Sequence, residues 1–153
     1  MTQFLAQNSD VVLKLIAAVG FGMLIGTERY WVRKEAGMKT HALVSLGAAA
    51  FVLISEMIAV KYADIANFDP TRIASQVIVG IGFLGAGSII FQGSRLRGLT
   101  TASGLWVTAG IGMATGFGFF SLAFISTILV LLIFTLMNIL ERPIRKISDD
   151  LDK

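Results

Sequence analysis

The stretch that decides the fold is HALVSLGAAAFVLISEMIAV, residues 41–60. A run of about 20 apolar residues can cross a hydrocarbon core of about 30 Å as a helix. Four comparable runs lie on either side of it, at residues 11–27, 73–91, 99–116 and 121–140. Because a backbone in lipid must satisfy its own hydrogen bonds, each run predicts a helix. The expected fold is an all-α, polytopic integral membrane protein with five transmembrane helices.

The composition supports a lipid environment. Hydrophobic residues make up 55% of the 153 residues, and charged residues only 15%, whereas soluble domains average about 25% charged. The net charge of +3 comes from short basic blocks between the runs, which we interpret as topology and not as a nucleic-acid surface. The chain has no cysteine, which excludes disulfides and thiolate chemistry, and no hydrolase motif is present. We expect neither an enzyme nor a cofactor.

The basic residues predict the orientation. Most of them lie at residues 28–40, at residues 92–98 and after residue 140. By the positive-inside rule, the N-terminus is then outside and the C-terminus cytoplasmic. We divide the chain into a transmembrane domain, residues 1–140, and a short cytoplasmic tail, residues 141–153. Since residues 1–10 carry no Lys or Arg, we expect the first run to be a retained helix and not a signal peptide.

Several short patterns predict helix ends. Tyr30 and Trp31 follow the first run, at the depth of an aromatic belt. Asp69 is an expected N-cap, with Pro70 at the first helical position. A tight turn is expected at residues 116–118, and Pro143 should break the last helix.

Glycine patterns predict close helix packing. Residues 80–85 match G-x-G-x-x-G, but a dinucleotide fingerprint needs a βαβ unit that a membrane span lacks. Small residues normally let transmembrane helices approach one another. An alternative is a locally unwound helix that lines a cavity. The glycines expected at packing or dimer faces are Gly22, Gly26, Gly80, Gly82, Gly85, Gly87, Gly112 and Gly116.

Polar residues within or next to the runs are the candidate functional groups, because ionisable groups are costly in lipid. Lys14 and Glu56 should form a membrane-edge ion pair, with a transport site as the alternative. Thr100 and Thr101 should cap a helix, or bind an anion at its N-terminus. For Mg²⁺ the candidates are Asp64, Asp69 and Glu56. The full functional set is Glu28, Arg29, Lys39, Thr40, His41, Arg72, Gln76, Thr100, Thr101 and Trp106.

Three stretches in this order resemble the membrane domain of the MgtC/SapB family. They are GMLIGTER at residues 22–29 continuing as AGMKTHALV at 36–44, RIASQV at 72–77 with GIGFLGAG at 80–87, and RGLTTA at 97–102 with LWVTAGIG at 105–112. The resemblance implies a bacterial inner-membrane protein associated with low magnesium, acid stress and virulence. Lys39 and Ser103 depart from the expected Arg and Ala. Longer members carry a soluble domain after the fifth helix, so roles of that domain are not expected here.

Three hypotheses follow. The first is a membrane regulator that binds another membrane protein, or itself as a homodimer, through glycine faces at residues 82–87 and 104–116. The second is a channel or carrier for an ion or small solute, using Glu28, Arg29, Gln76, Thr100 and Thr101. The third is Mg²⁺ sensing by the three acidic candidates.

Overall fold

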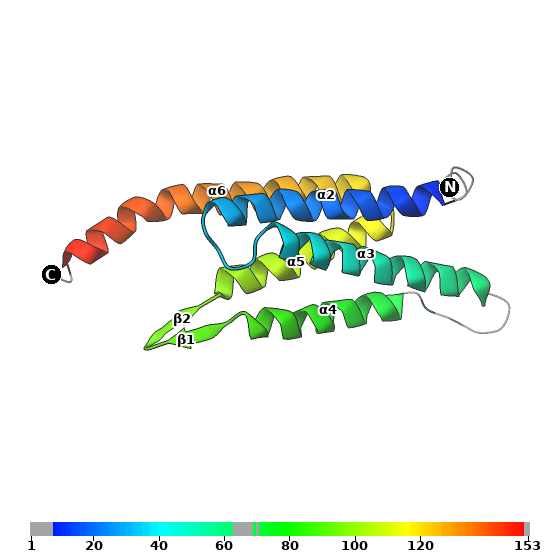
Figure 1. Ribbon diagram of the computed structural model, residues 1–153, viewed down its shortest axis with the longest axis horizontal. Helices are drawn as coiled ribbons and strands as arrows, with labels where there is room; N and C mark the ends of the chain where they lie inside the picture. Colours follow the sequence, from blue (N-terminus) through cyan, green and yellow to red (C-terminus); the bar gives the residue numbers. More distant parts are fainter. Residues whose placement is uncertain (1–7, 63–68, 70, 152–153) are drawn as a thin grey trace.

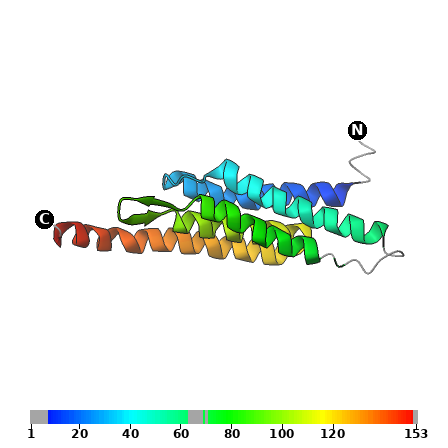
Figure 2. The ribbon, with the colours of Figure 1, turned by 90° about the horizontal axis from the view of Figure 1, so that it is seen from below.

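The computed structural model describes residues 8–62, 69 and 71–151, with side chains described as far as Leu140. The elements are helices α2 (Ser9–Trp31), α3 (Met38–Lys61) and α4 (Thr71–Gly87), strands β1 (Ile90–Gln92) and β2 (Arg95–Arg97), and helices α5 (Leu99–Gly116) and α6 (Phe120–Leu151). The helices run lengthwise in an elongated bundle (Figure 1). The α2–α3 loop, the β1–β2 hairpin and the end of α6 lie at one end, and the last turn of α3 and the first turn of α4 lie at the other (Figure 2).

Each of the five apolar runs forms a helix, as predicted. Three segments are long and apolar enough to cross a membrane, namely α2, α3 and residues 120–140 of α6, while α4 is a shorter apolar helix of 17 residues. Helix α5 packs against each of the other four helices. Its hydroxyls are satisfied within the helix, since Thr108 and Thr115 each donate to the carbonyl four residues earlier, at 2.7 and 2.8 Å. The helical class is confirmed, whereas five spans and their orientation stay predictions.

The first loop is shorter than the hydropathy predicts. Helix α2 continues to Trp31, and α3 begins at Met38. Glu28 and Arg29, which we expected in the loop, therefore lie inside α2. Both side chains have partners within the bundle, so their charges do not end the helix. Tyr30 and Trp31 end α2 with their side chains 65% and 82% exposed, as an aromatic belt requires.

The third run is not helical to its end. Helix α4 stops at Gly87, where Ser88 Oγ donates to the Gly85 carbonyl at 2.7 Å. An antiparallel hairpin follows, with Gln92 opposite Arg95 and Gly93 at φ 63° in its turn. Ile90 and Phe91, which we assigned to the helix, instead form β1 together with Gln92. The predicted C-terminal end of this helix is therefore wrong, while the helical class of the chain holds.

The hairpin ends at a glycine that no other residue could replace. Gly98 has φ 91°, and a Cβ there would lie 1.9 Å from the Ser88 carbonyl oxygen. Gly98 is the N-cap of α5, without a side-chain capping bond. The capping role predicted for Thr100 and Thr101 is thus wrong.

The end of the chain also differs from expectation. Helix α6 continues past Pro143 to Leu151, so the predicted break is wrong. A proline removes one backbone donor and can bend a helix without ending it, and α6 curves towards its C-terminal end in Figure 1. Residues 141–151 are hence helical and continue α6. The expected turn before α6 is confirmed, with Gly118 at φ 78°.

Candidate functional site

The first candidate site is a buried charge pair on α2 that reaches across to α6. Arg29 is only 2% exposed. Its Nε donates to Glu28 Oε2, and its guanidinium lies 3.5 Å from the ring centroid of Phe134. The second oxygen of Glu28 accepts from Asn138 Nδ2 at 3.0 Å. The pair is therefore neutralised, stacked and hydrogen-bonded within the helix bundle.

His41 on α3 contributes to the same interior and is fully buried. Its Nδ1 lies 2.8 Å from Thr108 Oγ1, and that hydroxyl donates its single hydrogen to the Gly104 carbonyl at 2.7 Å. His41 must then be the donor to Thr108, which places a proton on Nδ1. A Cβ at Gly104 would lie 3.1 Å from Phe134 and 3.4 Å from His41. His41 and the Phe134 ring that stacks on Arg29 therefore meet at Gly104.

We call Glu28, Arg29, His41, Ser45, Thr108 and Asn138 the polar centre. Three of its buried atoms have no hydrogen-bond partner among the described residues: Arg29 Nη2, His41 Nε2 and Ser45 Oγ. Leaving a buried polar group unpaired costs about 1–3 kcal/mol. This concentration of unsatisfied donors and acceptors in an apolar interior marks the polar centre as a candidate for function.

Glycines hold the helices around the polar centre at close range. A Cβ at Gly22 would lie 2.5 Å from the His41 carbonyl oxygen, and one at Gly112 would lie 2.2 Å from the Ser45 carbonyl oxygen. Gly26 and Gly116 meet α3 in the same way, at 2.5 and 2.9 Å. These four positions bring α2, α3 and α5 backbone to backbone, as small residues do in membranes.

The glycines of α4 behave differently. Only Gly85 has a neighbour, with its hypothetical Cβ 3.7 Å from Ala102. Gly80, Gly82 and Gly87 have no such atom within 4 Å. These three glycines, expected at packing faces, are therefore not used for close helix packing within the described chain.

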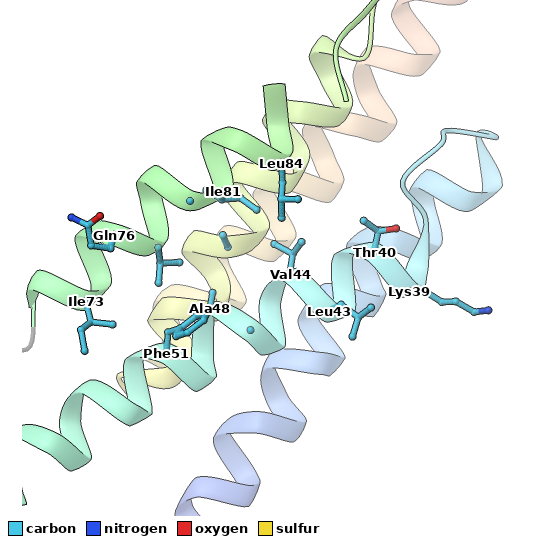
Figure 3. A pocket seen from close by; sticks show the side chains of 14 residues that line it. Lys39, Thr40, Leu43, Val44, Ala48, Phe51, Ile73, Gln76, Ile81 and Leu84 are labelled. Carbon is cyan, nitrogen blue, oxygen red and sulfur yellow. The ribbon is translucent and has the colours of Figure 1, made fainter. Parts of the chain in front are cut away.

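The second candidate site is a groove of about 710 Å³ between α3 and α4. Figure 3 shows Lys39 and Thr40 at one end and Gln76 at the other, with apolar side chains between them. A smaller cleft of about 400 Å³ adjoins it, sharing Thr40, Val44 and Leu84 and reaching Glu35 and Thr101. The residues that line the groove are Lys39, Thr40, Leu43, Val44, Gly47, Ala48, Phe51, Ile73, Gln76, Val77, Gly80, Ile81, Leu84 and Ala109.

The predicted functional residues are thus divided between two places. Glu28, Arg29 and His41 belong to the polar centre, while Lys39, Thr40 and Gln76 line the groove. Of the remaining four, Thr101 is buried and lines the adjoining cleft, whereas Arg72, Thr100 and Trp106 are exposed elsewhere on the surface. The residues that we expected to form one carrier path do not converge on one cavity.

Sequence reasoning missed Ser45, Thr108, Phe134 and Asn138. Asn138 carried a signal, because it is the sole amide side chain in the run at residues 121–140. Thr108 carried a weaker one, four residues after Gly104 in an apolar run. Neither signal reveals the hydrogen-bond partner of the residue, because the bonds join helices that are far apart in the sequence.

The acidic candidates for Mg²⁺ have other partners. Lys14 lies 3.7 Å from Glu56 and 3.0 Å from Asp10, which confirms the predicted ion pair. Asp69 Oδ1 accepts from the Thr71 hydroxyl and amide at 2.6 and 2.9 Å, and these bonds lower the pKa of that carboxyl. Asp69 therefore caps α4 as predicted, while Asp64 and Pro70 lie outside the described residues. Within the described part of the chain, no group of three or more potential metal ligands occurs.

Comparisons with a family model and with known proteins relate this chain to the same family. A family model described as the MgtC family matches residues 15–143. The chain is 47% identical over 120 residues to "Protein MgtC" of Salmonella typhimurium strain LT2, covering 78% of this chain and 49% of that protein. It is 39% identical over 132 residues to "Putative magnesium transporter YhiD" of Escherichia coli K12, covering 82% and 60% respectively.

A third relative is "Protein MgtC" of Brucella abortus, 39% identical over 135 residues, which are 88% of this chain and 52% of that protein. The chain thus spans about half the length of the curated relatives it matches. No solved structure matches it. With its apolar helices and a match over most of its length, this membrane protein belongs to the MgtC family.

Proposed function

We propose that this chain is an inner-membrane regulator, linked to adaptation to low magnesium, acid stress or virulence, that acts by binding a ligand in the α3–α4 groove. The observation that carries the proposal is the contrast between the two candidate sites. The polar centre is enclosed between closely packed helices, whereas the groove is large, apolar and formed on one side of the bundle. A binding surface fits this arrangement better than a solute path.

The close packing of the helices also favours a binding surface over a solute path. Gly22, Gly26 and Gly112 join α2, α3 and α5 so closely that no room is left for a methyl group. A path for a hydrated ion along those contacts would require the helices to separate. In contrast, Gly47 and Gly80 in the groove have no atom within 4 Å of a hypothetical Cβ, so α3 and α4 leave space beside them.

The link to magnesium rests on the relatives, one of which is named as a magnesium transporter. The proposal also includes the five-span topology, with the hairpin end in the cytoplasm. Among the residues whose side chains are described, the hairpin end carries Arg29, Arg33, Lys34, Lys39, Arg95 and Arg97 against Glu28 and Glu35. The opposite end carries Lys14, Lys61 and Arg72 against Asp10, Glu56 and Asp69. This difference agrees with the positive-inside rule.

A growth experiment tests the regulator function. Gly80→Leu would extend a side chain into the groove, because Gly80 lines it and has no atom within 4 Å of the position of its Cβ. Gly110→Leu is the matched control, since Gly110 is equally unobstructed but does not line the groove. Cells that depend on this protein at low magnesium should lose growth with Gly80→Leu and keep it with Gly110→Leu, at equal protein levels in the membrane. Equal growth of both strains would contradict the proposal.

The second candidate function is a channel or carrier, favoured by the three unpartnered polar atoms of the polar centre. Flux of Mg²⁺, K⁺, H⁺ and Ca²⁺ into proteoliposomes tests it, with Glu28→Gln and Gln76→Ala as variants. Flux that disappears with Glu28→Gln would replace the regulator by a transporter. In another version of the binding proposal, the chain binds a second copy of itself through Gly82 and Gly87. Chemical cross-linking in membranes would detect this self-association.

A further inference from the structure

The α3–α4 groove carries an inference that rests on the proposed function and names the ligand. We propose that the groove binds one anionic phospholipid, with its headgroup at Lys39 and an acyl chain lying along the groove. The polar lining supports this arrangement. Lys39 and Thr40 are together at one end, and between them and Gln76 the lining is apolar or glycine (Figure 3).

The shape of the groove suits a chain of methylene groups. Phe51, Ile73 and Leu84 project from the two helices towards the space between them (Figure 3). Gly47 and Gly80 widen that space, because neither has an atom within 4 Å of a hypothetical Cβ. Apolar side chains offer an acyl chain contacts but no hydrogen bonds. The chemistry of the occupant is therefore that of lipid along the groove and that of an anion at its end.

Charge complementarity identifies the headgroup as anionic. Among the residues whose side chains the structure describes, the hairpin end exposes, besides Lys39, four cations and a single carboxylate, Glu35, which lines the adjoining cleft. Arg29 is buried, and Glu28, whose side chain is 14% exposed, neutralises it. Basic residues at the mouth of a pocket between transmembrane helices attract anionic headgroups of the cytoplasmic leaflet. The four exposed cations are Arg33, Lys34, Arg95 and Arg97.

The same charges argue against a protein in the groove. A second copy inserted in the same orientation would bring an identical set of cations to this end. A transmembrane helix of another protein would also carry its basic flank on the cytoplasmic side. Both would place like charges side by side around Lys39, whereas a phosphodiester supplies the missing negative charge. We therefore assign the groove to lipid, and self-association would use another face.

Quenching of tryptophan fluorescence by brominated lipids tests the inference. The two native tryptophans, Trp31 and Trp106, are replaced by Phe. One reporter, Phe51→Trp, is placed in the groove, and a control reporter, Phe124→Trp, is placed on α6. The two positions are 54% and 56% exposed, so they are matched in accessibility. Vesicles contain phosphatidylglycerol and phosphatidylcholine with identical acyl chains, and one of the two is brominated along those chains.

The groove reporter should prefer phosphatidylglycerol about fivefold, which is the effect of one lysine beside an anionic lipid. The α6 reporter should show no preference. Lys39→Gln should abolish the preference at the groove, while Lys61→Gln at the opposite end should leave it unchanged. Gly80→Leu should reduce quenching of the groove reporter by both lipids, and higher salt should weaken the preference.

Three results would overturn the assignment. Equal quenching by the two lipids at the groove would show ordinary boundary lipid only. Absence of quenching at the groove, with normal quenching at α6, would show that protein fills the groove. A preference that survives Lys39→Gln would place the anion site elsewhere. None of these results bears on whether the protein is a transporter. The flux measurement decides between the regulator and the transporter, so the two proposals can fail separately.

Discussion

Replacing Glu28 by Gln tests whether the charge pair is as tightly enclosed as the structure shows. The substitution keeps the shape of the side chain and removes its charge. Arg29, 2% exposed, would then be a buried cation without a counterion. Removing one partner of a buried pair costs about 3–5 kcal/mol. Arg29 keeps its contact with Phe134, worth up to about 2 kcal/mol when desolvated, so we expect a loss near 3 kcal/mol.

The assay is reversible unfolding of the purified protein in mixed micelles, followed by circular dichroism. Glu56→Gln is the control, because the Lys14–Glu56 pair is longer, at 3.7 Å, and Glu56 is 38% exposed. That change should cost less than about 1 kcal/mol. A double replacement of Glu28 and Arg29 by Leu should recover most of the stability, since apolar residues can replace a buried pair. If Glu28→Gln and Glu56→Gln have the same small effect, the enclosed pair is refuted.

Three further predictions concern packing, hydrogen bonding and pH. Gly112→Ala should destabilise the protein by about 1–3 kcal/mol, because its methyl group would meet the Ser45 backbone at 2.2 Å, whereas Gly110→Ala should not; equal melting temperatures would contradict this. Thr108→Val should cost about 1–3 kcal/mol by leaving the His41 donor unpaired. Thr115→Val, whose hydroxyl bonds only within its own helix, should cost less in the same unfolding assay. Bonds from Thr71 hold the pKa of Asp69 below its ordinary 3.8, so its capping contribution should be complete above pH 3.8 and disappear as pH falls through the lowered pKa. The difference in melting temperature between wild type and Asp69→Asn, measured from pH 6 to pH 3, should change only in that acidic range; a constant difference would contradict the capping bond.

Physical patterns in the sequence predicted the helices and several of their ends. The five apolar runs predicted five helices, and the Lys14–Glu56 pair followed from depth in antiparallel neighbours. Where hydropathy alone set a boundary, the prediction was wrong. Glu28 and Arg29 looked like loop residues because they are charged, yet α2 continues through them. Ile90 and Phe91 looked helical because they are apolar, yet they belong to β1.

The sequence alone determined the helical class and the lipid environment that the apolar surface needs. It also determined which positions carry glycines that permit helices to approach closely. These properties depend on composition and on spacing along one helix, and both can be read from a linear chain. Only the tertiary structure decided which glycines are used. Gly22 and Gly112 touch another backbone, whereas Gly80 faces open space. The tertiary structure also joined Glu28 to Asn138 and His41 to Thr108, and it separated Gln76 from all of them. Such contacts depend on how helices distant in sequence are arranged, and the pattern within each helix does not encode that arrangement.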